Sequence, residues 1–154
     1  MGVVVPFFTH ASAVERLRGV IDGLHGSTYD LVLFNVESAL HRDEHFAALT
    51  GRARADGLLI MSLPPIPADL ERLRRSGVPV VLVDARGDGV PCVVTDDVEG
   101  GRIATRHLTA LGHERIAFMG GQADDELGFA ATEDRERGYV DVLLNAGLPT
   151  APDL

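Results

Sequence analysis

The sequence contains no lysine and only one cysteine, and each shortage excludes particular classes of protein. All 14 basic residues among its 154 are arginine. Without lysine, the chain cannot carry the lysine of a phosphate-binding loop, a Schiff-base enzyme or a two-component receiver. Cys92 alone cannot close an internal disulfide or form a Cys-x-x-Cys redox or zinc pair.

Long apolar runs and a secretion signal are also missing. No apolar run approaches the roughly 20 residues that cross a membrane, and the N-terminus has neither the charged start nor the cleavage site of a signal peptide. We therefore expect a cytoplasmic chain without a membrane partner. Negative charge is in excess, because 23 acidic and 14 basic residues give a net charge of -9. This charge repels phosphate backbones, so this segment by itself is not expected to bind DNA or RNA.

Short apolar runs alternate with stretches that have the periodicity of amphipathic helices. We predict strands at residues 3–5, 31–34, 58–61, 80–83, 92–94 and 116–118, and helices at 12–24, 43–54, 68–76, 98–111 and 133–146. Nearly continuous apolar strands separated by such helices indicate an α/β fold with a doubly wound parallel sheet covered on both faces. Ligands of such sheets gather at the carboxyl ends of the strands.

Several side chains have a predicted role within these elements. Ser12 and Glu15 match a capping box that would begin the first helix. Cys92 lies inside an apolar strand, where we expect a buried, inert thiol. Gly77 is expected to end the third helix. The side chains expected to face the core include Leu17, Ile21, Phe46, Leu49, Leu70, Leu73, Ile103, Leu108, Leu111, Tyr139, Val142 and Leu143.

Two motifs have both a chemical and a structural interpretation. The run from His41 to His45 fits the H-x-x-E-H pattern of zinc peptidases, but it lies at a polar helix start, so we expect a solvated helix entry and no metal. The glycine pairs at 100–101 and 120–121 lack the G-x-G-x-x-G spacing of a dinucleotide site. We therefore assign these glycines to packing and capping, and we expect no cofactor.

Acidic residues at two predicted element ends are candidate ligand contacts. Asp84 ends the fourth strand, where its carboxylate either accepts ligand hydroxyls or pairs with Arg86. Asp96 and Asp97 precede the fourth helix, and we expect at least one of them to cap it.

Arg135 stands in the first turn of the last helix, where a positive charge opposes the helix dipole. One interpretation is a salt bridge to the acidic residues nearby. The other is a planar donor group that points at an uncharged or anionic ligand. The acidic residues in question are Asp124, Asp125, Glu126, Glu133 and Asp134.

The order of these motifs resembles a known family. VVVP, LRGV, YDLVLFN, ADGLLIM, the stretch 77–121 and RERGY follow one another as in the effector-binding core of the lactose-repressor (LacI/GalR) family. The resemblance covers almost the whole chain. It implies a sensor and not an enzyme, with two lobes like those of periplasmic binding proteins that close on a sugar, nucleoside or similar effector. It also implies dimers that bind operator DNA through an N-terminal helix-turn-helix.

The resemblance further implies which residues contact the effector. Arg135 is the strongest of these candidates, whereas Arg137 is expected to remain in salt bridges. The full set of implied ligand contacts is His10, Ser12, Ala13, Met61, Ser62, Asp84, Thr95, Asp96 and Arg135.

The same resemblance divides the chain into two parts. Residues 1–96 would form the first effector-binding lobe, and residues 97–154 the start of a second, incomplete lobe, with no DNA-binding domain. The helices of the second part would have apolar faces without a sheet to cover. We expect this part to add a sixth strand to the first sheet, to pair with another copy, or to need further sequence. A homodimer is predicted, with domain swapping as one form of it.

Three other functions stay open from the residues alone. The chain could be a solute-binding protein of a transport system, or a small flavodoxin-like enzyme that uses Asp84 or His10 as acid or base. It could also be a dimerisation module without a ligand site. The leading hypothesis requires Asp84 and Arg135 to contact the same small polar ligand.

Overall fold

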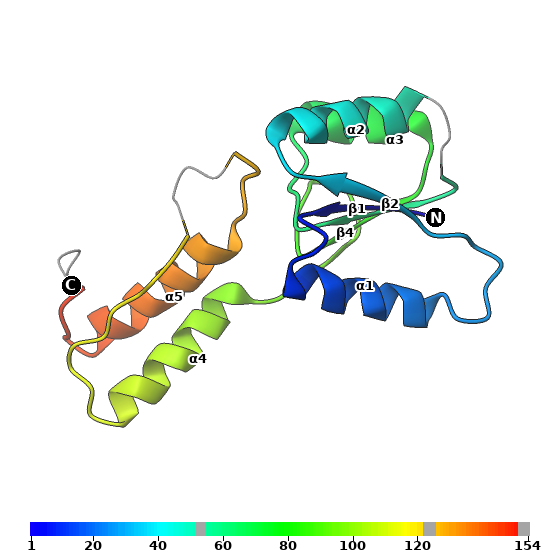
Figure 1. The fold of residues 1–154 in the computed structure, drawn as a ribbon. Helices are drawn as coiled ribbons and strands as arrows, with labels where there is room; N and C mark the ends of the chain where they lie inside the picture. The colour runs from blue at the N-terminus through cyan, green and yellow to red at the C-terminus, as the bar shows by residue number, and fades with distance from the viewer. Residues whose placement is uncertain (52–54, 122–125, 151–154) are drawn as a thin grey trace. The chain divides into compact units, whose positions relative to one another are not determined.

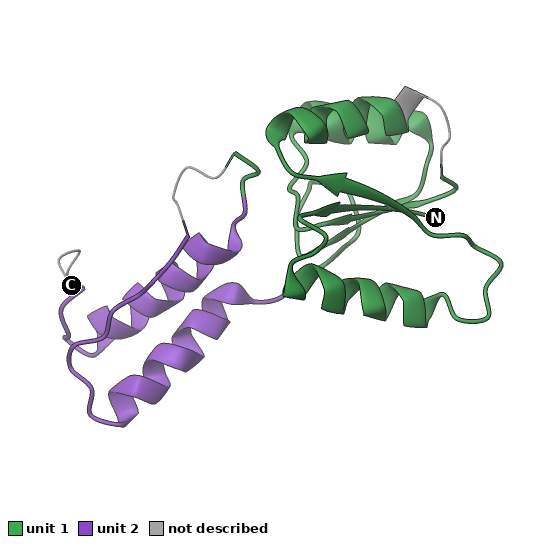
Figure 2. Cartoon of the chain, in the orientation of Figure 1, with its two compact units in different colours: residues 1–94, 126–128 green, residues 95–125, 129–154 purple. Residues whose placement is uncertain are grey.

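The computed structural model describes residues 1–51, 55–121 and 126–150. The chain divides into two compact units, which Figure 2 colours separately. Unit 1 comprises Met1–Val94 and Glu126–Gly128, and unit 2 comprises Thr95–Asp125 and Phe129–Leu154.

Unit 1 is built on one parallel sheet of five strands in the order β2-β1-β3-β4-β5. The strands are β1 (Gly2–Pro6), β2 (Val32–Val36), β3 (Leu58–Met61), β4 (Val80–Val83) and β5 (Cys92–Val93). Every strand pair is parallel, so all the carboxyl ends lie along one edge of the sheet. The predicted α/β fold with a parallel sheet is confirmed, and these five strands fall where the apolar runs predict them.

Helices cover both faces of this sheet (Figure 1). Helix α1 (Ala11–Gly23) lies on one face, and α2 (Ala39–Gly51) and α3 (Pro67–Ser76) lie on the other. Successive side chains of a strand point to opposite faces, and Val3 and Val5 accordingly pack with Ala13 of α1. All five residues of β1 are buried, which explains why its sequence is continuously apolar and does not alternate.

The helix predictions are correct in part. Leu70 and Leu73 are buried on α3, and Gly77 ends that helix in the left-handed conformation with φ 69°, as predicted. Ile21 of α1, expected in the core, is 56% exposed, because the buried stripe of α1 runs through Ala13, Leu17 and Val20 instead. The longest described helix has 15 residues, and no helix in the described ranges is long and apolar enough to cross a membrane.

Two local predictions at the ends of the sheet are wrong. The capping box at Ser12 does not form: His10 is the N-cap, and Ser12 already lies inside the helix. A turn that joins the His10 N–H to the Phe7 carbonyl at 2.8 Å starts α1 earlier than the sequence pattern predicts. Cys92 is exposed and not buried, since β5 is the edge strand of the sheet.

Unit 2 is a pair of helices, α4 (Asp97–Ala110) and α5 (Ala131–Asn145), in close contact. Two glycines allow that contact. A Cβ atom on Gly101 would lie 2.2 Å from the Arg135 carbonyl oxygen, and one on Gly138 would lie 2.0 Å from the Val98 carbonyl oxygen. The packing role predicted for Gly101 is confirmed.

The sixth predicted strand, residues 116–118, is not a strand in the structure. It does not join the sheet of unit 1, which has five strands, and the described part of unit 2 offers it no strand to pair with. Ile116 instead packs on α5, where its carbonyl accepts a 2.6 Å hydrogen bond from the Tyr139 hydroxyl. Ile103 and Leu111, predicted to face inward, are 58% and 63% exposed.

Candidate ligand-binding site

Three strands of the sheet are followed by residues with a strained backbone. Directly after β1, β3 and β4 come Phe7, Ser62 and Asp84, whose φ angles are 44°, 53° and 56°. Residues other than glycine seldom adopt this conformation, which costs about 1–3 kcal/mol and is concentrated at functional sites. All three residues lie at the carboxyl edge of the sheet, where ligands of such folds bind. This edge is therefore the candidate site in unit 1.

Backbone hydrogen bonds hold these strained residues in place. The N–H of Ser62 donates to the Val83 carbonyl at 2.7 Å, and the N–H of Asp84 donates to the Val93 carbonyl at 2.7 Å. Each bond extends the pairing one residue beyond the strand. The positions of the Ser62 and Asp84 side chains are therefore set by the rigid sheet and not by a loose loop.

A charged cluster forms where these two residues meet α1. The Arg16 Nη2 atom donates to Asp84 Oδ2 at 2.6 Å, and the Ser62 hydroxyl donates to the same oxygen at 3.1 Å. Both charged side chains are partly buried, Arg16 at 33% exposure and Asp84 at 18%. The cluster thus joins the ends of β3 and β4 to the first half of α1.

Arg16 is the residue of this candidate site that the sequence analysis does not predict. Asp84 was expected either to contact ligand or to pair with Arg86, and its partner is Arg16. A signal was present in the sequence: Arg16 lies three residues after Ala13 and four before Val20, which puts it beside the buried stripe of α1. A charged residue in such a place calls for a partner of opposite charge.

Aromatic rings border the same edge. The rings of Phe7 and His10 are stacked with centroids 5.1 Å apart and an interplanar angle of 18°. The backbone N–H of Phe8 donates to Asn35 Oδ1 at 3.2 Å, which fixes the loop after β1 against the end of β2. Phe8 itself is 39% exposed. Flat apolar faces therefore lie close in the chain to the polar groups of the site.

The other predicted contacts in unit 1 differ in exposure. Ser12 is exposed on the first turn of α1. Ala13 and Met61 are buried together in the core cluster that also contains Val3 and Val5. As ligand contacts, these three residues stay predictions.

The candidate residues of unit 2 gather around the start of α4. The Asp96 carboxylate accepts a hydrogen bond from the Glu99 N–H at 2.9 Å, so the predicted capping role is confirmed. Thr95, just before it, is exposed. Asp97 is buried, and its Oδ1 atom accepts from Arg135 Nε at 2.8 Å and lies 2.7 Å from Arg135 Nη2.

This pairing decides between partners that the sequence left open for Arg135. Its partner is Asp97 and not one of the acidic residues at 126, 133 or 134, while residues 124 and 125 lie outside the described residues. Arg137 pairs with Asp134 at 2.8 Å, as predicted. The Arg135 side chain is 55% exposed, so part of its planar group remains open to solvent. Its contact with ligand, and a ligand shared with Asp84, stay predictions.

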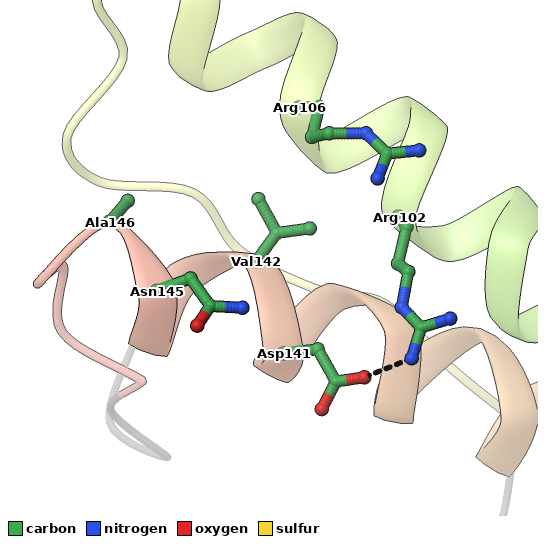
Figure 3. A pocket seen from close by; sticks show the side chains of 6 residues that line it. All are labelled: Arg102, Arg106, Asp141, Val142, Asn145 and Ala146. Carbon is green, nitrogen blue, oxygen red and sulfur yellow. Dashed lines mark hydrogen bonds and ion pairs between the residues drawn. The ribbon is translucent and has the colours of Figure 1, made fainter.

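A separate hollow of about 370 Å³ lies between α4 and α5 (Figure 3). Arg102 projects into it and donates to Asp141 Oδ2 at 2.6 Å. This hydrogen bond raises the pKa of Arg102. Arg106, beside it, pairs with Glu99. Because both arginines already have carboxylate partners, the hollow is a charge-balanced contact between helices and a weaker candidate for a ligand site.

The histidine motif of α2 has ordinary structural contacts. His45 Nε2 lies 3.1 Å from the Asn35 carbonyl oxygen, and its ring meets Phe34 edge-on with centroids 5.7 Å apart. His41 is exposed. Among the described residues, no group of three or more histidine, cysteine or acidic side chains could hold a metal ion.

Taken together, the carboxyl edge of unit 1 offers a carboxylate, a guanidinium, a hydroxyl and two stacked rings. These groups supply hydrogen-bond donors, acceptors and a flat surface, which is the chemistry that binds a small polar molecule.

Comparison with known proteins finds similar sequences among transcriptional regulators. The HTH-type transcriptional repressor PurR of Aliivibrio salmonicida is 30% identical over 151 residues, which are 96% of this chain and 43% of that protein. Catabolite control protein A of Priestia megaterium is 27% identical over 97% of this chain and 45% of its own length. The chain therefore spans less than half the length of these relatives.

Among solved structures, too, transcriptional regulators are similar to this chain. The transcriptional regulator CelR in complex with cellobiose superimposes with a TM-score of 0.78 and 30% identity, over 97% of this chain and 47% of that one. A LacI family transcriptional regulator from Mycobacterium smegmatis gives a TM-score of 0.75 and 31% identity, over 98% and 53% of the two chains. Residues 2–153 match the family described as periplasmic binding proteins and sugar binding domain of LacI family. This chain belongs to that family.

Proposed function

We propose that this chain is the effector-sensing region of a cytoplasmic LacI-type transcriptional regulator. The observation that carries the proposal is the Arg16–Asp84–Ser62 cluster at the strained carboxyl edge of a sheet of this family. The relatives compared above are named as transcriptional regulators or as a catabolite control protein, which supports regulation over catalysis. The family description also includes periplasmic binding proteins, and a solute-binding role is the alternative.

The proposed effector is a sugar or a nucleoside. In unit 1, Asp84 and Ser62 would exchange hydrogen bonds with its hydroxyls, beside the stacked Phe7 and His10 rings. We also propose Thr95, Asp96 and the open part of Arg135, all in unit 2, as ligand contacts. CelR was solved with cellobiose, which supports a carbohydrate ligand for this chain.

The proposed mechanism is a shift between two populated states. A ligand that binds one arrangement of the protein more tightly raises its population, and a homodimer would carry that change to bound DNA. We assign operator contact to a helix-turn-helix beyond these 154 residues, as the name of PurR implies for that relative. The net charge of -9 supports this assignment, since it disfavours direct contact of this region with DNA.

Calorimetric titration with a panel of sugars and nucleosides tests the proposal. Arg135→Ala is expected to weaken the affinity for the best ligand at least about tenfold, which corresponds to roughly 1.4 kcal/mol. Arg137→Ala is the matched control, because it removes a charge from the same helix but from a pair with Asp134. Arg135→Ala leaves Asp97 without its partner, so circular dichroism of both variants is needed to check that the helix content is unchanged.

Two results would contradict parts of this proposal. If no member of the panel binds the wild-type chain, the sensing function is wrong. If ligand binds and Arg135→Ala keeps the wild-type affinity, the function stands and the assignment of Arg135 to the site is wrong.

A further inference from the structure

The two oxygens of the Asp84 carboxylate have different surroundings. Oδ2 receives both hydrogen bonds of the cluster, from Arg16 and from the Ser62 hydroxyl. Within the residues that the structure describes, Oδ1 receives none, and it is not among the buried atoms without a partner. Oδ1 is therefore the acceptor that this edge of the sheet presents to an incoming molecule.

Arg16 presents the complementary groups. A guanidinium has five N–H donors, and Nη2 alone is within hydrogen-bond distance of Asp84. The remaining donors belong to a side chain that is one third exposed and that pairs with Asp84. A ligand at this edge thus meets an acceptor and several donors at one place.

The pair also sets the charge that the ligand meets. Alone, Asp84 would attract cations, and the net charge of -9 would strengthen that attraction. Arg16, 2.6 Å away, compensates the Asp84 charge and repels a ligand cation at the same place. Specificity arises as much from such a repulsive element as from attraction.

We infer that Arg16 is a specificity-determining residue, which makes the Asp84 end of the site select uncharged hydroxyl ligands against their amino analogues. The inference rests on the proposed function, because it concerns the same site. Arg16 acts in two ways, as a donor to ligand hydroxyls and as the charge that excludes an ammonium group.

The test compares sugars with their amino analogues on the wild-type chain and on Arg16→Met. The pairs are glucose and glucosamine, galactose and galactosamine, and mannose and mannosamine, titrated by amide NMR so that millimolar affinities are measurable. In the Arg16→Met variant, the Asp84 carboxylate has lost its arginine partner. We expect the affinity for the amino sugars, relative to the neutral sugars, to rise about tenfold over wild type.

Arg18→Met is the matched control. It removes the same charge from the same helix, but Arg18 is 67% exposed and pairs with Glu15 at 2.6 Å, away from Asp84. It is expected to keep the wild-type ratio of amino to neutral affinity. If Arg16→Met fails to fold, Arg16→Gln replaces it, because glutamine retains hydrogen bonding without the charge. Arg16→Lys restores the positive charge and is therefore expected to restore the wild-type preference for neutral sugars over amino sugars.

The outcomes separate this inference from the proposed function. An Arg16→Met chain that binds none of the amino sugars, or keeps the wild-type ratio, overturns the role of Arg16. A wild-type chain that binds the amino sugars as tightly as Arg16→Met also overturns it. Failure of the whole sugar and nucleoside panel, measured separately by calorimetry, overturns the proposed function instead.

Discussion

Two carboxylates of unit 1 have opposite surroundings. Asp84 has two donors on one oxygen, whereas Asp69, at the start of α3, is 2% exposed and its Oδ2 atom has no partner in the described structure. Arg72 lies 3.6 Å from the other Asp69 oxygen. An unpaired buried polar atom costs about 1–3 kcal/mol of folding free energy. Asp69 is thus a point where unit 1 is less stable than its packing allows.

This arrangement predicts a pH dependence of stability. Burial raises the pKa of Asp69 above its ordinary 3.8, although the Ile66 backbone and the charges of Arg42 and Arg72 act in the opposite direction. The folded state therefore holds the Asp69 proton more tightly than the unfolded chain. The stability linked to this proton is present below the unfolded pKa and is lost as pH rises through the folded pKa.

Urea denaturation of wild type and Asp69→Asn, from about pH 4 to pH 7, measures the effect. The wild-type free energy of unfolding should fall relative to that of Asp69→Asn as pH rises, since the variant has no proton to lose at this position. Asp22→Asn, at an exposed position of α1, should follow the wild-type profile. A constant difference between wild type and Asp69→Asn across the range would contradict the burial argument.

For single residues, the sequence predicts contacts with near neighbours in the chain. It does not predict contacts that depend on the order of the strands in the sheet. Asp96 as a helix cap needs only Glu99, three residues later. The Arg16–Asp84 pair joins residues 68 apart in sequence, and it exists because α1 follows β1 and β1 lies next to β3 and then β4. No local pattern contains that order, so the sequence predicts only a nearby partner for Asp84, Arg86, two residues away.

Among the elements, the contact between α4 and α5 is the most sensitive to substitution. Gly138→Ala would place a Cβ atom 2.0 Å from the Val98 carbonyl oxygen of α4, a backbone atom that cannot rotate away. We expect a loss of about 3 kcal/mol of stability in unit 2, in the range that overpacking produces. Hydrogen exchange of the α4 and α5 amides under native conditions measures this loss separately from unit 1.

Gly100→Ala is the control for this prediction. Gly100 is adjacent to Gly101 on α4, but a Cβ atom there would meet nothing within 4 Å. Alanine favours the helix over glycine by about 0.5–1 kcal/mol, so this variant should be slightly more protected from exchange than wild type. Equal protection in Gly138→Ala and Gly100→Ala would show that the helices do not approach each other this closely.

The elements also show where periodicity predicts structure and where it fails. The first five strands were predictable, because each contains an apolar run that is visible in any window of the sequence, even in β2 and β5, where part or all of the run is exposed. The run at 116–118 has the same composition, yet a strand exists only beside another strand, and the described part of unit 2 has none to offer. The prediction that Ile103 and Leu111 face inward is wrong because the described part of unit 2 has no sheet for them to cover. Helix α4 instead buries the side that carries Gly101 and Thr105 against α5.

For the whole molecule, the apolar residues on the surface of unit 2 predict association. Their exposed fractions are large, and the residues are Ile103 at 58%, Leu111 at 63%, Leu144 at 63% and Met119 at 96%. Exposed apolar surface favours pairing with a second copy, and a homodimer agrees with the proposed function. Light scattering on a size-exclusion column should give twice the mass of one chain.

Leu111→Glu should lower that mass to one chain, because a buried charge opposes the contact. Leu40→Glu is the control, since Leu40 is 67% exposed but lies on α2 in unit 1. The association prediction fails if the wild-type chain has the mass of a monomer, or if both variants behave alike.

The most direct test of the central claim is to map where a bound ligand lies. Amide NMR spectra of the chain, titrated with the tightest ligand of the panel, report every residue whose surroundings change. We predict that the largest shifts occur at Phe7, Ser62 and Asp84, after β1, β3 and β4, and at Arg135 on α5. Shifts confined to the hollow between Arg102 and Asp141, with none at the carboxyl edge of the sheet, would contradict the account.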